Sequence, residues 1–201
     1  MDKRAIPDPC DLAETSNRYF PRLLLHSCCA PCSSHVISVL SADYSLTVFY
    51  FNPNIYPFGE YEKRKNQQLK LLTSARYDNP VSFIDGDYNR EQFTSAVKGL
   101  EQAAEGGARC RVCFTLRLSE TARTAKLSGF DIMATTLSVS PRKDAAAINE
   151  IGSECAKQQG IAWLSADFKK DGGWQNSVAL SKRYGLYRQR YCGCEHSLRI
   201  L

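Results

Sequence analysis

Three tight groups hold seven of the nine cysteines in this 201-residue chain. Thiolates grouped in this way either bind a soft metal or exchange electrons. The groups lie far apart in the sequence, so only the folded chain can bring them together. The sequence therefore predicts a metal or redox site built from Cys28-Cys29-Ala-Pro-Cys32, Cys110-Arg-Val-Cys113 and Cys192-Gly-Cys194.

The kind of site depends on how these thiols are divided. A structural zinc site usually uses paired C-x-x-C motifs, whereas this chain has one regular pair and more thiols than one tetrahedral ion needs. An iron–sulfur cluster also takes four Cys ligands and tolerates irregular spacing, which leaves three thiols for redox work. Cys29-Ala-Pro-Cys32 also resembles a thioredoxin active site, but that alternative leaves Cys28, Cys110 and Cys113 unexplained.

Strands and helices alternate along the chain after residue 20. Short apolar or β-branched segments predict strands, and longer segments with helical periodicity predict helices. This alternation is typical of a parallel sheet covered by helices on both faces. We expect an α/β fold in which residues 21–201 form a single catalytic domain and residues 1–20 an N-terminal extension. The predicted strands cover residues 22–26, 46–51, 81–84, 131–135 and 161–164, and the predicted helices cover residues 33–40, 60–77, 91–105, 111–127, 142–159 and 174–184.

The predicted topology places several polar groups at one edge of the sheet. Sites in parallel sheets form beyond the carboxyl ends of the strands. The first cysteine group follows the first strand, Asn52 the second, residues 138–141 the fourth and Asp167 the fifth. Cys32 should lie near a helix N-terminus, where the dipole stabilises a thiolate. His26, beside the cysteines, would be either a proton relay or a hydrogen-bonded core residue.

Basic residues outnumber acidic ones in two stretches, 109–143 and 169–190, and the whole chain carries a net charge of +5. Each stretch is either a solvated helix face or a surface for a polyanion such as nucleic acid. Tyr187, Arg188 and Tyr191 would stack on an unstacked base and bind its phosphates, or they pack the C-terminal tail. Ser140, just before the predicted helix over 142–159, and Lys143, in its first turn, would hold a phosphate at the helix N-terminus.

The sequence contains no signal for export or membrane insertion. No apolar run approaches the ~20 residues of a membrane span. Residues 1–20 are polar and acidic, unlike a signal peptide, and Leu23–Leu25 are too few for a lipoprotein signal. We therefore expect a cytoplasmic protein with no membrane partner. Clustered cysteines in such a protein indicate metal binding or catalysis rather than a disulfide framework. Cys10 and Cys155 lie outside the groups and suit burial.

Six strings together resemble one family, the cobalamin-independent epoxyqueuosine reductases (QueH). They are LLLHSCCAPCSS, FYFNPNIYPFGEYEKR, CRVCFTLRLSETA, GFDIMATTLSVSPRKD, ADFKKDGG and YGLYRQRYCGCEHS, which run from about Leu23 to about Ser197 with no departure at a motif cysteine. The resemblance implies a Rossmann-like fold of the HUP type. It also implies the last step of queuosine biosynthesis, in which the epoxide on a modified wobble guanosine in tRNA is reduced to an alkene.

The resemblance further implies roles for the cysteines. A [4Fe–4S] cluster would be bound by Cys28, Cys29, Cys110 and Cys113. Cys192 and Cys194 would form a redox-active pair, and the reaction would need an electron donor that the sequence does not identify. Removal of the epoxide oxygen also consumes two electrons and two protons.

Cys32 and Asp167 are left beside the cluster. Asp167 would either help to hold an additional iron ion, or cap the next segment, or pair with Lys169 or Arg142. The expected substrate-binding residues are Asn52, Ser140, Lys143, Tyr187, Arg188 and Tyr191. Two other functions fit the cysteines: a zinc-stabilised nucleic-acid-binding module and a thiol–disulfide oxidoreductase.

Overall fold

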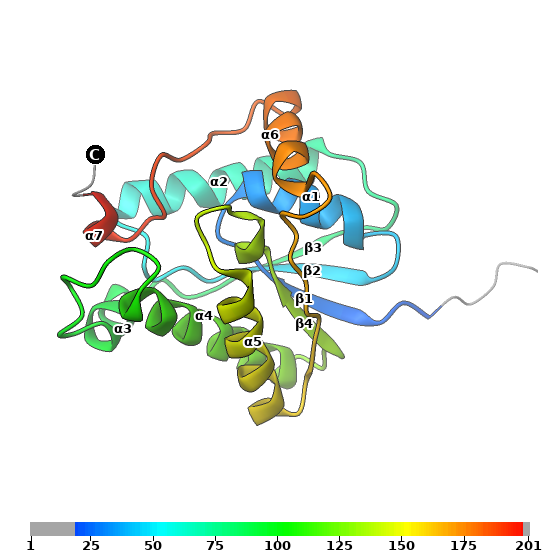
Figure 1. The fold of residues 1–201 in the computed structure, drawn as a ribbon. Helices are drawn as coiled ribbons and strands as arrows, with labels where there is room; N and C mark the ends of the chain where they lie inside the picture. The colour runs from blue at the N-terminus through cyan, green and yellow to red at the C-terminus, as the bar shows by residue number, and fades with distance from the viewer. Residues whose placement is uncertain (1–18, 199–201) are drawn as a thin grey trace, which may run out of the picture.

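Five parallel strands form the centre of the structure, a computed structural model that describes residues 19–198 (Figure 1). Their order is β3-β2-β1-β4-β5, and every neighbouring pair is parallel. The predicted parallel sheet is therefore confirmed, and its order is that of a Rossmann-like fold. The strands are β1 (Arg22–His26), β2 (Ser45–Tyr50), β3 (Ser82–Asp85), β4 (Ile132–Thr135) and β5 (Ala162–Trp163).

Helices cover both faces of this sheet, as the alternation of the sequence predicts. One face carries α1 (Ala30–Leu40), α2 (Phe58–Ser74) and α6 (Gly173–Arg183) (Figure 1). The other face carries α3 (Arg90–Ala96), α4 (Ala108–Leu127) and α5 (Ala145–Gln159). A 3-10 helix, η2 (Thr136–Val139), follows β4, and a short α7 (Glu195–Leu198) ends the described chain. Among the described residues, no helix is long and apolar enough to cross a membrane.

The central strand is the most buried element. Leu23, Leu24 and Leu25 of β1 are fully buried because β1 has a strand on each side and helices on both faces. A strand in this position is apolar on both faces, which explains its continuous leucine run. Residues 1–18, which include Cys10 and most of the expected N-terminal extension, lie outside the described residues.

The helices differ from their predicted boundaries, and three of the differences have a local cause. The helix expected over 91–105 ends at Ala96, because Gly99 and Gly106 take positive φ angles of 83° and 86°, and residues 97–107 form a loop. The helix expected from residue 142 begins only at Ala145, because the Asp144 side chain accepts hydrogen bonds from the first helical N–H groups. The helix expected from residue 33 already begins at Ala30, with a proline in its first turn.

Candidate active site

The site lies where the chain connections diverge to opposite faces of the sheet. β1 and β4 are neighbours, but β1 continues into α1 on one face and β4 continues through η2 into α5 on the other. A crevice forms beyond the carboxyl ends of two strands at such a point. The first cysteine group follows β1 and residues 138–141 follow β4, so both contribute to this crevice, as their positions in the sequence predict.

The first cysteine group is compact. The sulfur atoms of Cys28, Cys29 and Cys32 all lie within 4.8 Å of one another, and those of Cys28 and Cys29 are 3.9 Å apart. All three residues are buried. Cys29 occupies the N-cap of α1 with extended backbone angles, and Cys32 lies in the first turn of the helix. This strand-to-helix turn therefore points adjacent residues toward one centre, where they could bind a metal.

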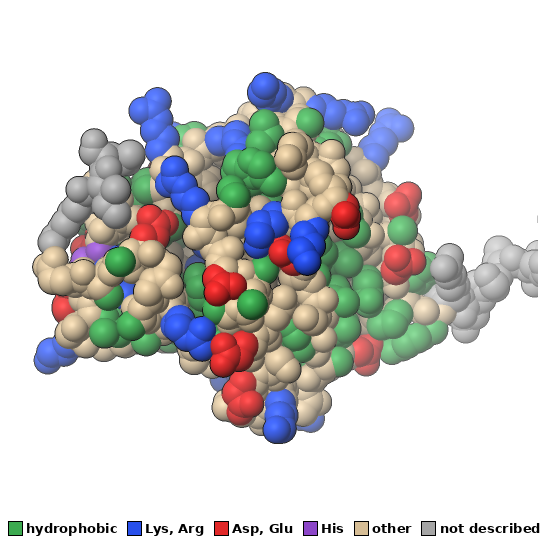
Figure 2. Space-filling model, in the orientation of Figure 1, with side chains coloured by type: hydrophobic (Ala, Val, Ile, Leu, Met, Phe, Trp, Pro, Cys, Tyr) green, Lys and Arg blue, Asp and Glu red, His purple; other side chains and the backbone are tan. Residues whose placement is uncertain are grey.

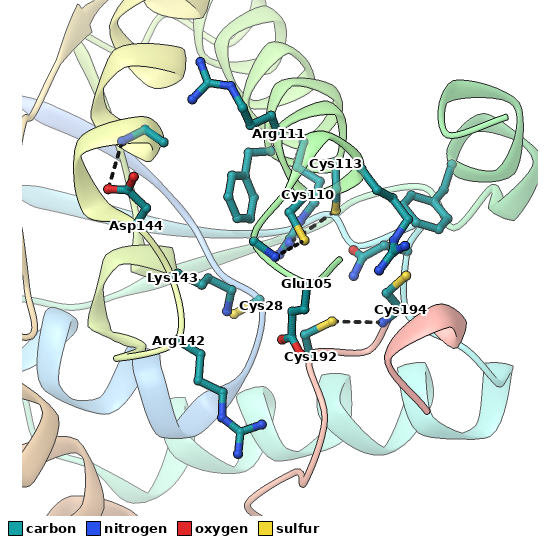
Figure 3. A pocket seen from close by; sticks show the side chains of 17 residues that line it. Cys28, Glu105, Cys110, Arg111, Cys113, Arg142, Lys143, Asp144, Cys192 and Cys194 are labelled. Carbon is teal, nitrogen blue, oxygen red and sulfur yellow. Dashed lines mark hydrogen bonds between the residues drawn. The ribbon is translucent and has the colours of Figure 1, made fainter. Parts of the chain in front are cut away.

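The other two cysteine groups meet the first at one cavity, here called the cysteine cavity (Figure 3). Cys110 and Cys113 come from the first turns of α4, where residues three apart share a face. Cys192 and Cys194 come from the C-terminal tail. Together with Cys28 these thiols line a space of about 100 Å³. Folding thus joins all three sequence motifs at one place.

A second, larger recess adjoins the first and is here called the basic groove. Its volume is about 460 Å³, and its lining includes Cys32, Ser140 and Tyr191. It shares Cys192 and Lys143 with the cysteine cavity, so the two spaces are neighbours. Figure 3 shows Lys143 pointing toward Cys28. Two further residues also line both spaces, namely Glu105 and Arg142.

Arg64 of α2 holds the C-terminal cysteine segment in place. Its side chain is 1% exposed, pairs with Glu60 at 2.7 Å, and donates to the carbonyl oxygens of Cys192 at 3.0 Å and Tyr191 at 3.2 Å. Gly193 has a φ of +113°, and a side chain there would lie 2.8 Å from Ile55. The Cys192–Cys194 turn therefore requires glycine at its centre, as the sequence indicates.

Asn52 was expected to contact substrate, but the structure places it in the protein interior. It is fully buried, donates to the Ser27 carbonyl at 2.8 Å, and accepts from Arg117 Nη2 at 2.6 Å. The Arg117 Nη1 atom in turn lies 4.0 Å from the Cys113 sulfur. Asn52 thus orients a buried cation next to a thiol.

Two thiols in this site favour the charged form. Hydrogen bonding from Cys29 and Cys32 holds the pKa of Cys28 well below its usual value, although burial opposes this effect. Hydrogen bonding from Cys194 likewise lowers the pKa of Cys192. Burial lowers the pKa of Lys143, but the nearby thiolates of Cys28 and other cysteines outweigh it and raise that pKa. Negative charge therefore gathers at Cys28 and Cys192, opposite a lysine.

Burial raises the pKa of the two thiols on α4, Cys110 and Cys113. Their thiolates therefore need a positive neighbour or a metal to be stable. Arg117 provides positive charge near Cys113, and the Gly106 N–H lies 3.2 Å from the Cys110 sulfur.

His26 is a hydrogen-bonded core residue. It is fully buried, with Nδ1 2.8 Å from the Thr135 hydroxyl and Nε2 3.2 Å from the Phe51 carbonyl. Its pKa is lowered to about 3, mainly by burial and to a smaller extent by the positive charge of Arg117. A neutral imidazole at this point joins the carboxyl ends of β1 and β4, and it lines neither recess.

The remaining expected residues divide into two groups. Asp167 forms an ion pair with Lys169 at 2.9 Å, and Tyr187 donates to Glu60 at 3.3 Å. Neither Asp167 nor Tyr187 lines the cysteine cavity or the basic groove. The others line the basic groove, namely Ser140, Lys143, Arg188 and Tyr191.

The two basic stretches contribute only part of their charge to the site. Arg109 is buried and donates to the Leu100 and Glu101 carbonyls, and Arg111 pairs with Glu150 at 2.8 Å. The cations that line the groove are Arg142, Lys143, Arg188 and Arg190. Figure 2 shows Lys and Arg side chains gathered over α6 and its surroundings, whereas Asp and Glu side chains gather over α5.

Residues 60–64 follow the second predicted strand, so the sequence predicts them at the same edge of the sheet, but it assigns no role to several side chains of the site. Arg64 and Arg117 are buried cations on helices, where a sequence pattern predicts a solvated face. Glu105 was expected inside a helix, and its place in the loop brings it to both recesses. Trp174 lines the groove from the first turn of α6. The only sequence feature that could have pointed to Trp174 is the family string ADFKKDGG, which ends directly before it.

Comparison with known proteins matches nearly the whole chain to one family. The sequence model of the family described as epoxyqueuosine reductase QueH matches residues 23–200. A protein of that name from Streptococcus pyogenes serotype M1 is 40% identical over 182 residues, covering 90% of this chain and 71% of the relative. Another from Thermotoga maritima is 36% identical over 184 residues, covering 88% of this chain and 90% of the relative. The chain therefore belongs to the epoxyqueuosine reductase QueH family.

Proposed function

We propose that this protein reduces the epoxide of epoxyqueuosine to the alkene of queuosine at the wobble position of tRNA. This would be the last step of queuosine biosynthesis, and a tRNA substrate implies a cytoplasmic enzyme. The observation that carries the proposal is the meeting of three cysteine groups at one cavity beside a basic groove, in a chain of the QueH family. A zinc-stabilised binding module would not need so many thiols around one cavity.

The donor set fits an iron–sulfur cluster, which would be a [4Fe–4S] cluster held by Cys28, Cys29, Cys110 and Cys113. Cys28, Cys110 and Cys113 line one cavity, and the Cys29 sulfur is 3.9 Å from that of Cys28. When bound, such a cluster passes electrons one at a time. Arg117, Lys143 and the Gly106 N–H offset the negative charge of the ligands, as outer-shell groups of metal sites do.

The remaining thiols suit electron transfer to the substrate. Oxidation of Cys192 and Cys194 to a disulfide releases two electrons and two protons. Conversion of an epoxide to an alkene and water consumes the same number, so this step balances. Cys192 lines both recesses, and the Cys194 N–H lies 3.4 Å from its sulfur. An external electron donor would then reduce the disulfide again.

Of the two residues left beside the cluster, Cys32 is placed to bind an additional iron ion and Asp167 is not. The Cys32 sulfur lies within 4.8 Å of those of Cys28 and Cys29, so it would complete a three-thiol group. Asp167 is paired with Lys169 and lines neither recess, which favours the ion pair that the sequence left open. The arrangement of this carboxylate therefore gives no support to an additional iron.

The basic groove would receive the anticodon loop. Single-stranded RNA is recognised by stacking of unstacked bases and by cations on the phosphates. Tyr191 and the groove cations supply both kinds of contact next to Cys192. The epoxide-bearing part of the modified base would reach the cysteine cavity from this side, with Lys143 at the junction of the two spaces.

The test is turnover by protein prepared without oxygen and supplied with iron and sulfide. Transfer RNA that carries epoxyqueuosine would be incubated with the reduced enzyme, and the nucleosides would be identified by mass spectrometry. We expect queuosine, formed with loss of one oxygen atom, and brown protein that contains iron and acid-labile sulfide. Unchanged epoxyqueuosine with fully loaded, reduced enzyme would contradict the proposal. Colourless, folded protein that binds only zinc would favour the binding module.

A further inference from the structure

The basic groove contains an aromatic side chain that no part of the proposed chemistry uses. Trp174 lies in the first turn of α6, is half-buried, and lines the groove together with Arg188 and Tyr191. The Arg188 guanidinium carbon is 4.9 Å from the centre of the Trp174 ring system. A cation at this distance from an indole face is attracted to the ring. One face of Trp174 is therefore occupied by a residue of the protein.

Arg188 is itself held in place by two hydrogen bonds to α6. Its Nη1 atom donates to the Ser181 hydroxyl at 3.0 Å and to the Ser177 carbonyl at 3.4 Å. Ser177 and Ser181 are each 1% exposed and lie one turn apart on α6. These contacts restrict the guanidinium, which in turn restricts the indole. Trp174 is thus a preorganised platform rather than a freely rotating surface side chain, and preorganisation lowers the cost of binding.

The two recesses differ in size in a way that suits a polynucleotide. The cysteine cavity measures about 100 Å³ and the basic groove about 460 Å³. Ligand-sized pockets generally span roughly 300–1,000 Å³, so only the groove has room for a complete nucleotide unit. Because Cys192 and Lys143 line both spaces, a group bound in the groove lies directly next to a group reacting in the cavity.

Two groove cations remain available for phosphate. The side chains of Arg142 and Arg190 are exposed and form no ion pair or hydrogen bond with another described residue. Arg188, by contrast, is engaged with α6 and Trp174. Guanidinium groups bind phosphate through two parallel hydrogen bonds. The groove therefore adds the Trp174 platform and two free cations to Tyr191, and aromatic faces with cations are what binds single-stranded nucleic acid.

We propose that Trp174 is the stacking platform for an unstacked nucleotide adjacent to the modified one, and that Arg142 and Arg190 bind the flanking phosphates. The inference rests on the proposed function and deepens it. It defines the substrate as a modified nucleoside inside a single-stranded RNA segment, with a neighbouring base that contributes to binding. Arg188 is a positioning residue that holds the platform.

Binding can be measured without any turnover. The chain has two tryptophans, and Trp163 donates its indole N–H to Asn149 on α5, away from both recesses. In a Trp163→Phe variant, Trp174 becomes the sole indole fluorophore. An RNA stem–loop with the anticodon sequence should quench this fluorescence on binding, because the base stacks on the ring. Full binding by fluorescence anisotropy of labelled RNA, without any change in Trp174 emission, would overturn the proposal.

Turnover then tests the neighbouring base. Trp174→Leu should lower kcat/KM for an epoxyqueuosine stem–loop roughly tenfold to a hundredfold, the usual effect of losing one stacked base. An abasic site next to the modified position should lower kcat/KM of the wild type by a similar factor. Only one of the two neighbours, the 5′ or the 3′ one, should have this effect. For that abasic stem–loop, Trp174→Leu should not lower kcat/KM any further. Trp174→Phe should restore most of the activity.

The outcomes separate the two proposals. If the wild type reduces no form of the substrate, the proposed function fails. Suppose instead that the wild type is active and that Trp174→Leu lowers kcat/KM by the same factor for the intact and the abasic stem–loop. The role of Trp174 as a platform is then wrong, and the proposed function stands. Thermal melting and iron content of each variant identify losses caused by misfolding. Trp174→Leu should keep its full iron content, since Trp174 lines the basic groove but not the cysteine cavity.

Discussion

The Arg64 Nη1 atom lies 3.0 Å from the carbonyl oxygen of Cys192, although 128 positions separate the two residues in the sequence. This contact ties the C-terminal cysteine pair to α2, which follows the second strand. The same guanidinium binds Glu60 and the Tyr191 carbonyl. This buried cation therefore helps to fix where the last cysteine group lies, together with the 2.8 Å hydrogen bond from the Tyr56 N–H to the Gly193 carbonyl.

Replacing Arg64 with Ala should destabilise the protein and misplace the cysteine pair. The change leaves two carbonyl groups without this donor and Glu60 without its cation, with only the Tyr187 hydroxyl among the described residues still donating to it. Breaking a buried ion pair costs roughly 3–5 kcal/mol. Epoxide reduction should fall more than iron content does, because the cluster ligands come from other segments. Thermal unfolding, iron analysis and turnover measure the three effects. Arg123→Ala, which breaks an exposed pair with Glu120, is the control and should cost less than about 1 kcal/mol. Equal losses in both variants would contradict the positioning role.

Cys110→Ala or Cys113→Ala should abolish cluster binding. Each change removes one of four proposed ligands from the cysteine cavity. The absorption of reconstituted protein, its iron and its acid-labile sulfide report the loss. Cys155→Ala is the matched control, because Cys155 is buried elsewhere, 3.3 Å from the Ser119 hydroxyl. A brown Cys113→Ala protein with full iron content would exclude Cys113 from the ligand set.

Cys192→Ser or Cys194→Ser should abolish epoxide reduction while the protein keeps its iron, sulfide and absorption. Serine cannot donate electrons by forming a disulfide, and Gly193 already provides the positive φ of +113° that a ring across so short a turn requires. Thiol trapping should find two fewer free thiols in oxidised than in reduced wild-type protein. Loss of the cluster in both serine variants would instead assign this pair to the ligand set and release Cys28 or Cys29.

Acid should destabilise the wild type partly through His26. The pKa of His26 falls from 6.5 to about 3 in the folded protein. Between these values the unfolded chain binds a proton that the folded chain excludes, so stability decreases as pH falls below 6.5. This one group contributes at most about 1.4 kcal/mol per pH unit.

His26→Gln keeps a polar side chain next to Thr135 and Phe51 but removes the titrating group. The difference in unfolding free energy between wild type and variant at pH 8 gives the packing cost alone. That difference should shrink steadily from pH 6.5 toward pH 4, as measured by denaturant unfolding at matched metal content. A difference that is independent of pH would show that His26 is not buried in its neutral form.

Local patterns in the sequence were enough to predict the sheet and the approximate position of the site. β1 coincides with the predicted strand, because a short leucine run bounded by polar residues suits a strand buried on both faces. The cysteine spacings within each group are also local, so a single turn of chain determines which sulfurs can share a centre. The order of strands and helices then placed the first group at the carboxyl edge of the sheet.

Tertiary packing alone decided how the groups meet and which polar residues support them. A helical pattern cannot distinguish a solvated arginine from Arg64 or Arg117, since burial depends on partners supplied by distant segments. Asn52 was placed at the correct edge of the sheet, yet its amide faces Ser27 and Arg117 rather than solvent. The end of α3 at Ala96 brought Glu105 to the site. Contacts between residues this far apart in sequence have no local signature, because the free energy that stabilises them arises only when the whole core has formed.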